Sequence, residues 1–91
     1  MSVTFEIPAP LLRFTGGQSR VVIEGGDVQA VLDGVWRQFP ELQQRMMTPS
    51  GELFPYLLLF HNGEKLSREG FTSIPLAEGD RLELIGLAEG G

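Results

Sequence analysis

The chain has 91 residues, no cysteine and a formal net charge of −5, so it can build one domain with a modest core and no disulfide, thiolate metal site or cysteine nucleophile. Its seven lysines and arginines are scattered singly, which argues against nucleic acid as a partner. The longest apolar run, at residues 56–60, is far shorter than the ~20 residues that span a bilayer, and the start of the chain shows no export signal. We therefore expect a cytoplasmic protein that does not enter membranes.

The first half of the chain predicts a hairpin followed by a helix. Residues 3–7 alternate apolar and polar side chains, the pattern of a strand with one buried face. Residues 20–24 set Val21 and Ile23 on one face against Arg20, Val22 and Glu24, and Gly16 and Gly17 supply the turn between the two strands. Asp27 stands where a helix N-cap is expected. The apolar residues that follow recur at helical spacing and should lie on a sheet: Val28, Val31, Leu32, Val35, Trp36 and Phe39.

The second half predicts further strands separated by turns. Residues 41–47 add a short helical turn, and residues 56–60 form a strand that stops at the Asn62–Gly63 turn and briefly restarts. Residues 81–87 form the last strand. The order predicts a single α+β domain, residues 1–91, with a mixed sheet of four to five strands and one main helix packed on one face.

This order resembles the β-grasp fold of ubiquitin, and four stretches resemble the MoaD/ThiS family of sulfur carriers. They are IPAPLLRFTGGQ at residues 7–18, HNGE at 61–64, IPLAEGDRLEL at 74–84 and the final pair, Gly90 and Gly91. The turns alone are common, whereas IPxPLxxxTGGQ combined with a final GG is fairly specific. The opening stretch is most similar to CysO-type carriers of cysteine biosynthesis and to related standalone MoaD-like proteins.

The resemblance implies a protein co-substrate and not an enzyme. In the family, an E1-like enzyme uses ATP to adenylate the carboxylate of the terminal glycine, sulfide converts it to a thiocarboxylate, and a sulfur-accepting biosynthetic enzyme takes the sulfur. On this chain the resemblance implies that Gly91 is the reacting residue and that Gly90, which has no side chain, precedes it. The carrier itself is expected to bind no cofactor, because ATP and sulfide are used by the partner enzyme. The product served is cysteine, molybdopterin, thiamine or a related sulfur metabolite.

The C-terminal stretch, residues 85–91, is expected to be the end of the last strand and a flexible tail. It departs from the usual family ending in two places. Gly86 stands where proline is common, and Glu89 places a negative charge two residues from the end. These departures leave open which activating enzyme accepts the tail.

The strands predicted at residues 56–60 and 81–87 carry apolar side chains on both faces, although one helix covers only one face of a small sheet. We expect the outward side chains to form an exposed apolar patch beside the tail, and to bind partners together with Glu89. The patch consists of Leu58, Phe60, Ile85 and Leu87. The alternatives are that a loop around Leu53 or Phe54 covers these residues, or that the two strands are simply central.

Other polar residues are interpreted as structural. His61, the only histidine, has no companion in the pattern for catalysis or metal binding. The acidic residues Glu78, Asp80 and Glu83 lack calcium-loop spacing and are expected to be solvated.

Three functions therefore remain open. The first is the sulfur carrier, the second is a ubiquitin-like modifier attached to lysines of other proteins through Gly91, and the third is a β-grasp interaction domain with an incidental tail. The first two begin with the same acyl adenylate, so the sequence does not separate them. The free protein is expected to be a monomer.

Overall fold

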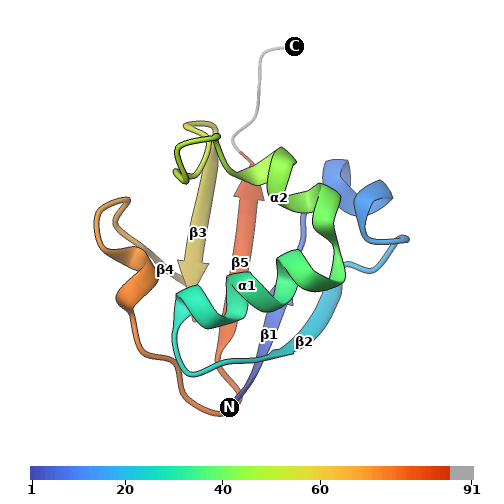
Figure 1. The fold of residues 1–91 in the computed structure, drawn as a ribbon. Helices are drawn as coiled ribbons and strands as arrows, with labels where there is room; N and C mark the ends of the chain where they lie inside the picture. Colours follow the sequence, from blue (N-terminus) through green and yellow to red (C-terminus); the bar gives the residue numbers. More distant parts are fainter. Residues whose placement is uncertain (87–91) are drawn as a thin grey trace.

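The structure, a computed structural model, describes residues 1–86 of the chain. Five strands and two α-helices, with two short 3-10 helices, make up the fold (Figure 1). In chain order they are β1 (Ser2–Glu6), η1 (Ala9–Phe14), β2 (Arg20–Glu24), α1 (Val28–Gln38), α2 (Pro40–Met46), β3 (Leu57–His61), β4 (Glu64–Lys65), η2 (Phe71–Ser73) and β5 (Arg81–Gly86).

The five strands form one mixed sheet in the order β2-β1-β5-β3-β4. Strand β5 pairs in parallel with β1 and antiparallel with β3, while β1–β2 and β3–β4 are antiparallel pairs. The last strand along the chain is therefore the central strand of the sheet. Helix α1 crosses one face, with α2 beside it (Figure 1). This is the β-grasp arrangement that the sequence predicted, with the full five strands.

The TGGQ motif closes the connection between η1 and β2. Gly16 and Gly17 have φ angles of 67° and 87°, which favour glycine. Thr15 is buried, and its hydroxyl oxygen lies 2.8 Å from the carbonyl oxygen of Gln18. The Gln18 amide donates back to the carbonyl of Thr15 at 3.2 Å. The motif thus holds a turn together, which is a structural role.

Helix α1 begins as predicted, because the Asp27 carboxylate accepts a hydrogen bond from the backbone N–H of Ala30 at 2.8 Å. Its apolar stripe is buried at Val28, Val31, Leu32 and Val35, while Trp36 is half-buried against the core. The helix ends at Gln38, and Pro40 begins α2. Helix α2 covers the predicted segment one residue earlier, at 40–46 instead of 41–47, since Pro40 suits a first helical position and Leu42 and Met46 are fully buried.

The core lies between the sheet and the helices. Its largest fully buried side chains are Phe5, Leu32, Leu42, Met46, Leu82 and Leu84. The segment before β5 contributes Phe71 and Leu76, and Ile74 packs against the core from its edge. Within residues 1–86, no helix combines the length and the hydrophobicity needed to cross a membrane.

Candidate functional site

The end of β5 positions the segment on which the sequence-based hypothesis depends. The parallel pairing with β1 runs from Thr4–Arg81 to Glu6–Glu83, whereas the pairing with β3 continues to Leu57–Gly86. The final residues of β5 therefore extend past the paired part of β1 and are held by β3 alone. The predicted site residues Leu87, Glu89, Gly90 and Gly91 lie outside the residues that the structure describes.

Three members of the predicted apolar patch lie together on the sheet face opposite α1. Leu58 and Ile85 are direct cross-strand partners, and Phe60 follows Leu58 on the same face. All three are half-buried, whereas Leu57 and Leu59 are each 3% exposed and point into the core. The predicted alternation is thus confirmed. We refer to Leu58, Phe60 and Ile85 as the outer-face trio; its role in partner binding stays a prediction.

The segment named as a possible cover reaches this face at one point, because Leu53 lines the same small cleft as Leu58. Leu53 belongs to the buried core, and Phe54 stacks on Tyr56 with ring centroids 5.4 Å apart. A small cleft beside Leu58 is shared with Leu66 and Phe71, which brings the segment after β4 against one side of the trio.

A groove runs along the end of β5, between that strand and the beginning of β2. Two of its charged members form an ion pair, because Glu6 lies 3.7 Å from the guanidinium of Arg20, and Glu83 adds a further negative charge. The groove is lined by Glu6, Ile7, Pro8, Ser19, Arg20 and residues 83–86. It adds a second accessible surface next to the last described residue of the chain.

Arg68 fixes the start of β3, which no local sequence pattern indicated. Its guanidinium donates hydrogen bonds to the backbone carbonyls of Leu53, Pro55 and Leu57 at 3.2, 2.8 and 2.7 Å. The carbonyls of Leu53 and Pro55 belong to the irregular segment that leads into β3, and Leu57 is the first residue of the strand. One side chain therefore satisfies three backbone acceptors and helps to set the position of the outer-face trio.

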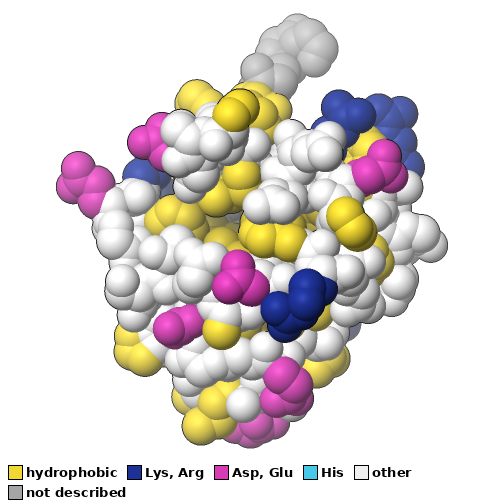
Figure 2. Space-filling view, in the orientation of Figure 1, with side chains coloured by type: hydrophobic (Ala, Val, Ile, Leu, Met, Phe, Trp, Pro, Cys, Tyr) yellow, Lys and Arg dark blue, Asp and Glu magenta, His cyan; other side chains and the backbone are white. Residues whose placement is uncertain are grey.

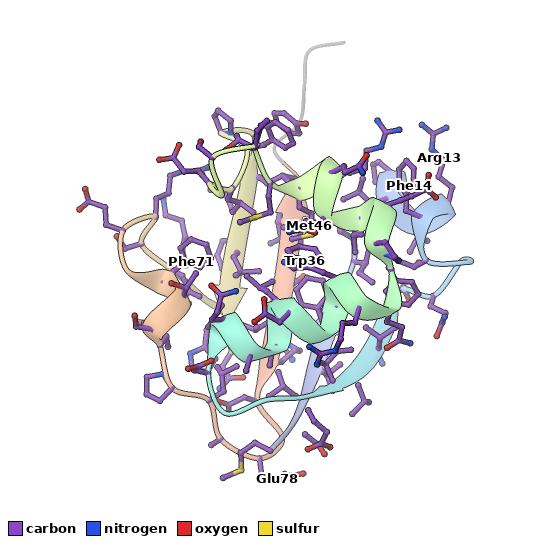
Figure 3. The ribbon with its side chains drawn as sticks, viewed as in Figure 1. Arg13, Phe14, Trp36, Met46, Phe71 and Glu78 are labelled. Carbon is purple, nitrogen blue, oxygen red and sulfur yellow. The ribbon has the colours of Figure 1, made fainter. Side chains whose placement is uncertain are left out.

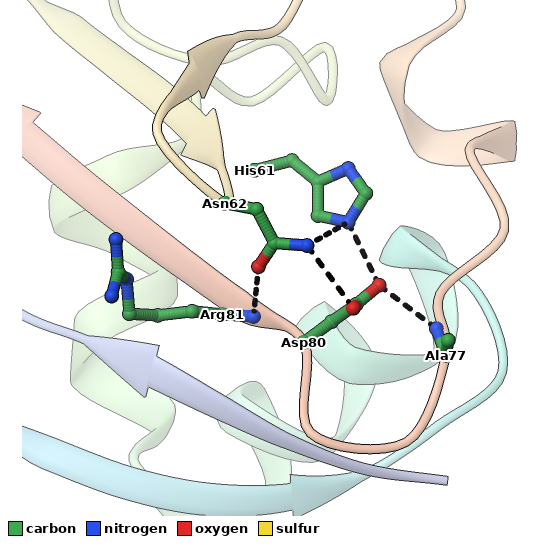
Figure 4. A network of polar contacts seen from close by, with 5 residues as sticks. All are labelled: His61, Asn62, Ala77, Asp80 and Arg81. Atoms are coloured by element: carbon green, nitrogen blue, oxygen red, sulfur yellow. Dashed lines mark hydrogen bonds and ion pairs between the residues drawn. The ribbon is translucent and has the colours of Figure 1, made fainter.

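His61 and Asp80 form a polar network at the opposite end of β5 (Figure 4). The Nε2 atom of His61 lies 2.8 Å from a carboxylate oxygen of Asp80, which also accepts a hydrogen bond from the backbone N–H of Ala77. Asn62 donates to Asp80 at 3.1 Å and accepts from the backbone N–H of Arg81 at 2.8 Å. The network ties the β3–β4 turn to the start of β5.

Hydrogen bonding shifts the pKa of two carboxyl groups. The N–H of Ala77, followed by His61 and Asn62, lowers the pKa of Asp80 to about 2. The Ser2 hydroxyl and then the N-terminal ammonium lower the pKa of Glu24. Asp80 immediately precedes β5, and Glu24 is the last residue of β2. Both carboxyl groups lie at the sheet end away from Gly86 and stabilise structure there.

The acidic residues near this turn do not converge on a metal site. Glu78 accepts a hydrogen bond from the backbone N–H of Ser2 at 2.9 Å, while Asp80 is engaged by His61. Glu83 lies on the outer face opposite Phe60. Across residues 1–86, no three histidine or acidic side chains come close enough to hold a metal ion.

Comparison with known proteins places the chain among small carriers of the same size. It is 30% identical to the sulfur carrier protein CysO of Mycobacterium tuberculosis over 93 aligned positions, which cover all of both chains. It also superposes on the crystal structure of the Amycolatopsis orientalis BexX/CysO complex with a TM-score of 0.86 and 26% identity, covering 98% of this chain and 99% of the other.

A further solved structure, SAMP1 of Haloferax volcanii, superposes with a TM-score of 0.83 and 28% identity over the whole of both chains. No protein-family model matches the sequence.

Proposed function

The chain belongs to the ubiquitin-like sulfur carrier family that includes CysO, and we propose that Gly91 carries sulfur as a C-terminal thiocarboxylate. The observation that carries the proposal is the full-length similarity to CysO together with the topology. The similarity relates the chain to a sulfur carrier of similar length, and in this chain the last strand is central to the sheet, so the fold holds the residues that precede the tail. In the proposal, a partner enzyme binds the folded part of the carrier, and residues 87–91 bring the reacting carboxylate to that enzyme.

The proposed chemistry explains why two glycines suit the end of the chain. A carboxylate is a poor electrophile, so an E1-like enzyme first joins the Gly91 carboxylate to the α-phosphorus of ATP and releases pyrophosphate. Sulfide then attacks the acyl carbon of the adenylate, and AMP leaves. The enzyme must enclose ATP and the tail together, and Gly90 offers no side chain to clash with the walls of that channel.

The partners follow from the same chemistry. Activation uses ATP and sulfide, so the proposal requires the E1-like enzyme and an acceptor enzyme for the sulfur. The CysO relationship favours cysteine biosynthesis as the destination over molybdopterin or thiamine. The Amycolatopsis CysO crystallised in complex with BexX, and this supports a carrier that works by docking on partner proteins.

The test is the intact mass of the protein after incubation with ATP, an E1-like enzyme from the same source and a sulfide donor. We expect a mass gain equal to the exchange of one oxygen for one sulfur. Deletion of Gly91 and replacement of Gly90 by tryptophan should each abolish the gain while the circular dichroism spectrum stays unchanged. An unmodified mass with an enzyme of demonstrated activity, or normal modification of the Gly90 variant, would count against the proposal.

A second candidate function is conjugation to other proteins. The 28% identity to SAMP1, a small archaeal modifier protein, favours it. An acyl adenylate can be attacked by a lysine amine as well as by sulfide, so one chain can serve both reactions. Conjugation would appear in cells as higher-mass species that carry this chain and disappear when Gly91 is deleted.

A further inference from the structure

Two arginines from different elements meet over the ring of Phe14. The guanidinium carbon of Arg13 lies 5.1 Å from the ring centroid, and that of Arg45 lies 4.7 Å from it. Arg13 and Phe14 end η1, whereas Arg45 occupies the last turn of α2, which packs against η1. Figure 3 shows Arg13 and Phe14 at the upper end of the molecule, where β5 also ends. We call Arg13, Phe14 and Arg45 the arginine pair site.

The ring and the helix ends hold the two charges in place. Phe14 is half-buried and packs against the core, while both arginine side chains are exposed. A cation over an aromatic face is attracted by the π electrons, and a cation in the last turn of a helix interacts favourably with its dipole. The arrangement therefore presents guanidinium groups at the surface with less freedom than isolated arginines have.

The two positive charges act together on their surroundings. Since both guanidinium carbons lie within about 5 Å of one centroid, they lie within about 10 Å of each other, a Debye length at ~0.1 M salt. Within the described part of the chain, neither Arg13 nor Arg45 forms an ion pair. This includes Glu41, which lies one helical turn before Arg45 but forms no ion pair with it. The site therefore keeps its charge available for a partner.

The location of this charge contrasts with the composition of the protein. The net charge is −5, yet Figure 2 shows Lys and Arg side chains gathered at the upper right, over η1 and α2. Neither arginine lines the cleft between α1 and α2 or the groove beside β5, so the pair faces outward. A paired, outward cationic surface fits carboxylates that protrude from another protein.

We propose that the arginine pair site docks an acidic segment, a run of Asp and Glu side chains, on the enzyme that activates the tail. The inference rests on the proposed function for the identity of that enzyme, but not for the chemistry of recognition. The site lies at the end of the sheet from which the tail leaves, so a partner that holds it is placed beside the reacting terminus. Its charge steers the encounter and fixes the orientation of the carrier.

The first experiment tests recognition without any enzyme. A glutamate hexapeptide is titrated into the full-length protein at low salt, and the Nε–H signals of its arginines are followed by NMR. We expect the largest shifts at Arg13 and Arg45, and, in the Arg13→Glu/Arg45→Glu variant, loss of the peptide-induced shift of the Phe14 backbone N–H signal that the wild-type protein shows. Shifts as large at Arg37, an exposed arginine of α1, or tighter binding of inorganic phosphate than of the peptide, would overturn the proposal.

The second experiment measures how fast the E1-like enzyme activates the carrier at increasing carrier concentration. The Arg13→Glu/Arg45→Glu variant should have a KM about tenfold higher than the wild type, and this KM should change less with salt concentration. Its kcat should be little changed. Arg37→Glu, which reverses a single charge on α1 and so makes half of the double variant's change in net charge, should leave KM at the wild-type value. If the reversed protein does not fold, Arg13→Gln/Arg45→Gln replaces it, with a smaller rise expected.

The two experiments separate failure of this inference from failure of the proposed function. Normal thiocarboxylate formation with unchanged KM in the double variant would remove the docking site and leave the sulfur carrier intact. Absence of thiocarboxylate in the wild-type protein would remove the proposed function, and the peptide titration would then decide the docking site alone.

Discussion

Asp80 holds together the end of the sheet at which β5 begins. It receives hydrogen bonds from Ala77 and Asn62 and contacts His61, and these join the β3–β4 turn to β5. A lone histidine and an acidic residue 19 positions apart give no local signal of such pairing. The structural interpretation of His61 agrees with its place in the network, whereas the interpretation of Asp80 as merely solvated is wrong.

The network predicts a defined loss of stability in acid. The folded state holds the pKa of Asp80 at about 2, below its ordinary value of 3.8, so its ionised form stabilises folding. That contribution is fully present above about pH 4 and is lost as the pH falls toward 2. The difference in unfolding free energy between wild type and Asp80→Asn, from denaturant titrations, should shrink over this window. Glu69→Gln, at an exposed position, serves as control; a gap that stays constant with pH contradicts the prediction.

At the scale of elements, the packing of α1 on β2 depends on Gly34. A Cβ atom built at this position would lie 2.6 Å from the Cγ2 atom of Ile23, which is buried in β2. The helix can lie this close to the strand only because residue 34 has no side chain. The helical periodicity predicted α1, but it did not reveal why a poor helix former stands in its middle.

Replacing Gly34 by alanine should therefore destabilise the protein. Helix propensity alone would add about 1 kcal/mol of stability, whereas overpacking a close contact costs about 1–3 kcal/mol. We expect a net loss of about 1 kcal/mol in the free energy of unfolding, measured by urea titration. Gly26→Ala is the matched control, since its Cβ meets nothing within 4 Å, and it should be neutral or slightly stabilising. Equal gains in both variants would show that α1 can move away from β2.

At the scale of the whole molecule, the two faces of the sheet differ in role: one packs against the core, and the other is predicted to bind partners. One face is covered by the helices, whereas the other carries the outer-face trio toward the end of β5 and mostly polar side chains on β1 and β2, with the exposed Val22 among them. The trio, the groove beside β5 and the arginine pair site all lie toward the end where β5 finishes. The polar network of Asp80 closes the other end.

The trio predicts a docking phenotype that can be separated from folding. Ile85→Gln should raise the KM of the activating enzyme for the carrier about tenfold, because an apolar contact at a protein interface is lost. Half-buried residues also contribute to the fold, so a loss of about 1 kcal/mol of stability is expected. Val22→Gln is the control on the same face, since Val22 is 66% exposed on the distant strand β2. A similar KM for both variants would assign activation to a different surface.

The sequence by itself determined the local elements of this protein. Period-two alternation predicted the strands and the inward side chains Leu57 and Leu59, helical periodicity predicted α1, and Asn62–Gly63 predicted a turn whose residues have φ angles of 51° and 88°. The motifs also pointed to the family that the comparison with CysO established. Each of these signals resides in neighbouring residues, whose side-chain directions follow from backbone geometry alone.

Only the tertiary structure decided which distant residues meet. Arg68 reaches three carbonyls 11 to 15 positions earlier in the chain, and Arg45 joins Arg13 over Phe14 because α2 packs on η1. Asp80 meets His61 because β5 inserts between β1 and β3. Such contacts depend on how complete elements pack, which no short stretch of sequence encodes. Sequence patterns and residue spacing therefore do not predict these contacts, even where each participating helix or strand is predicted correctly.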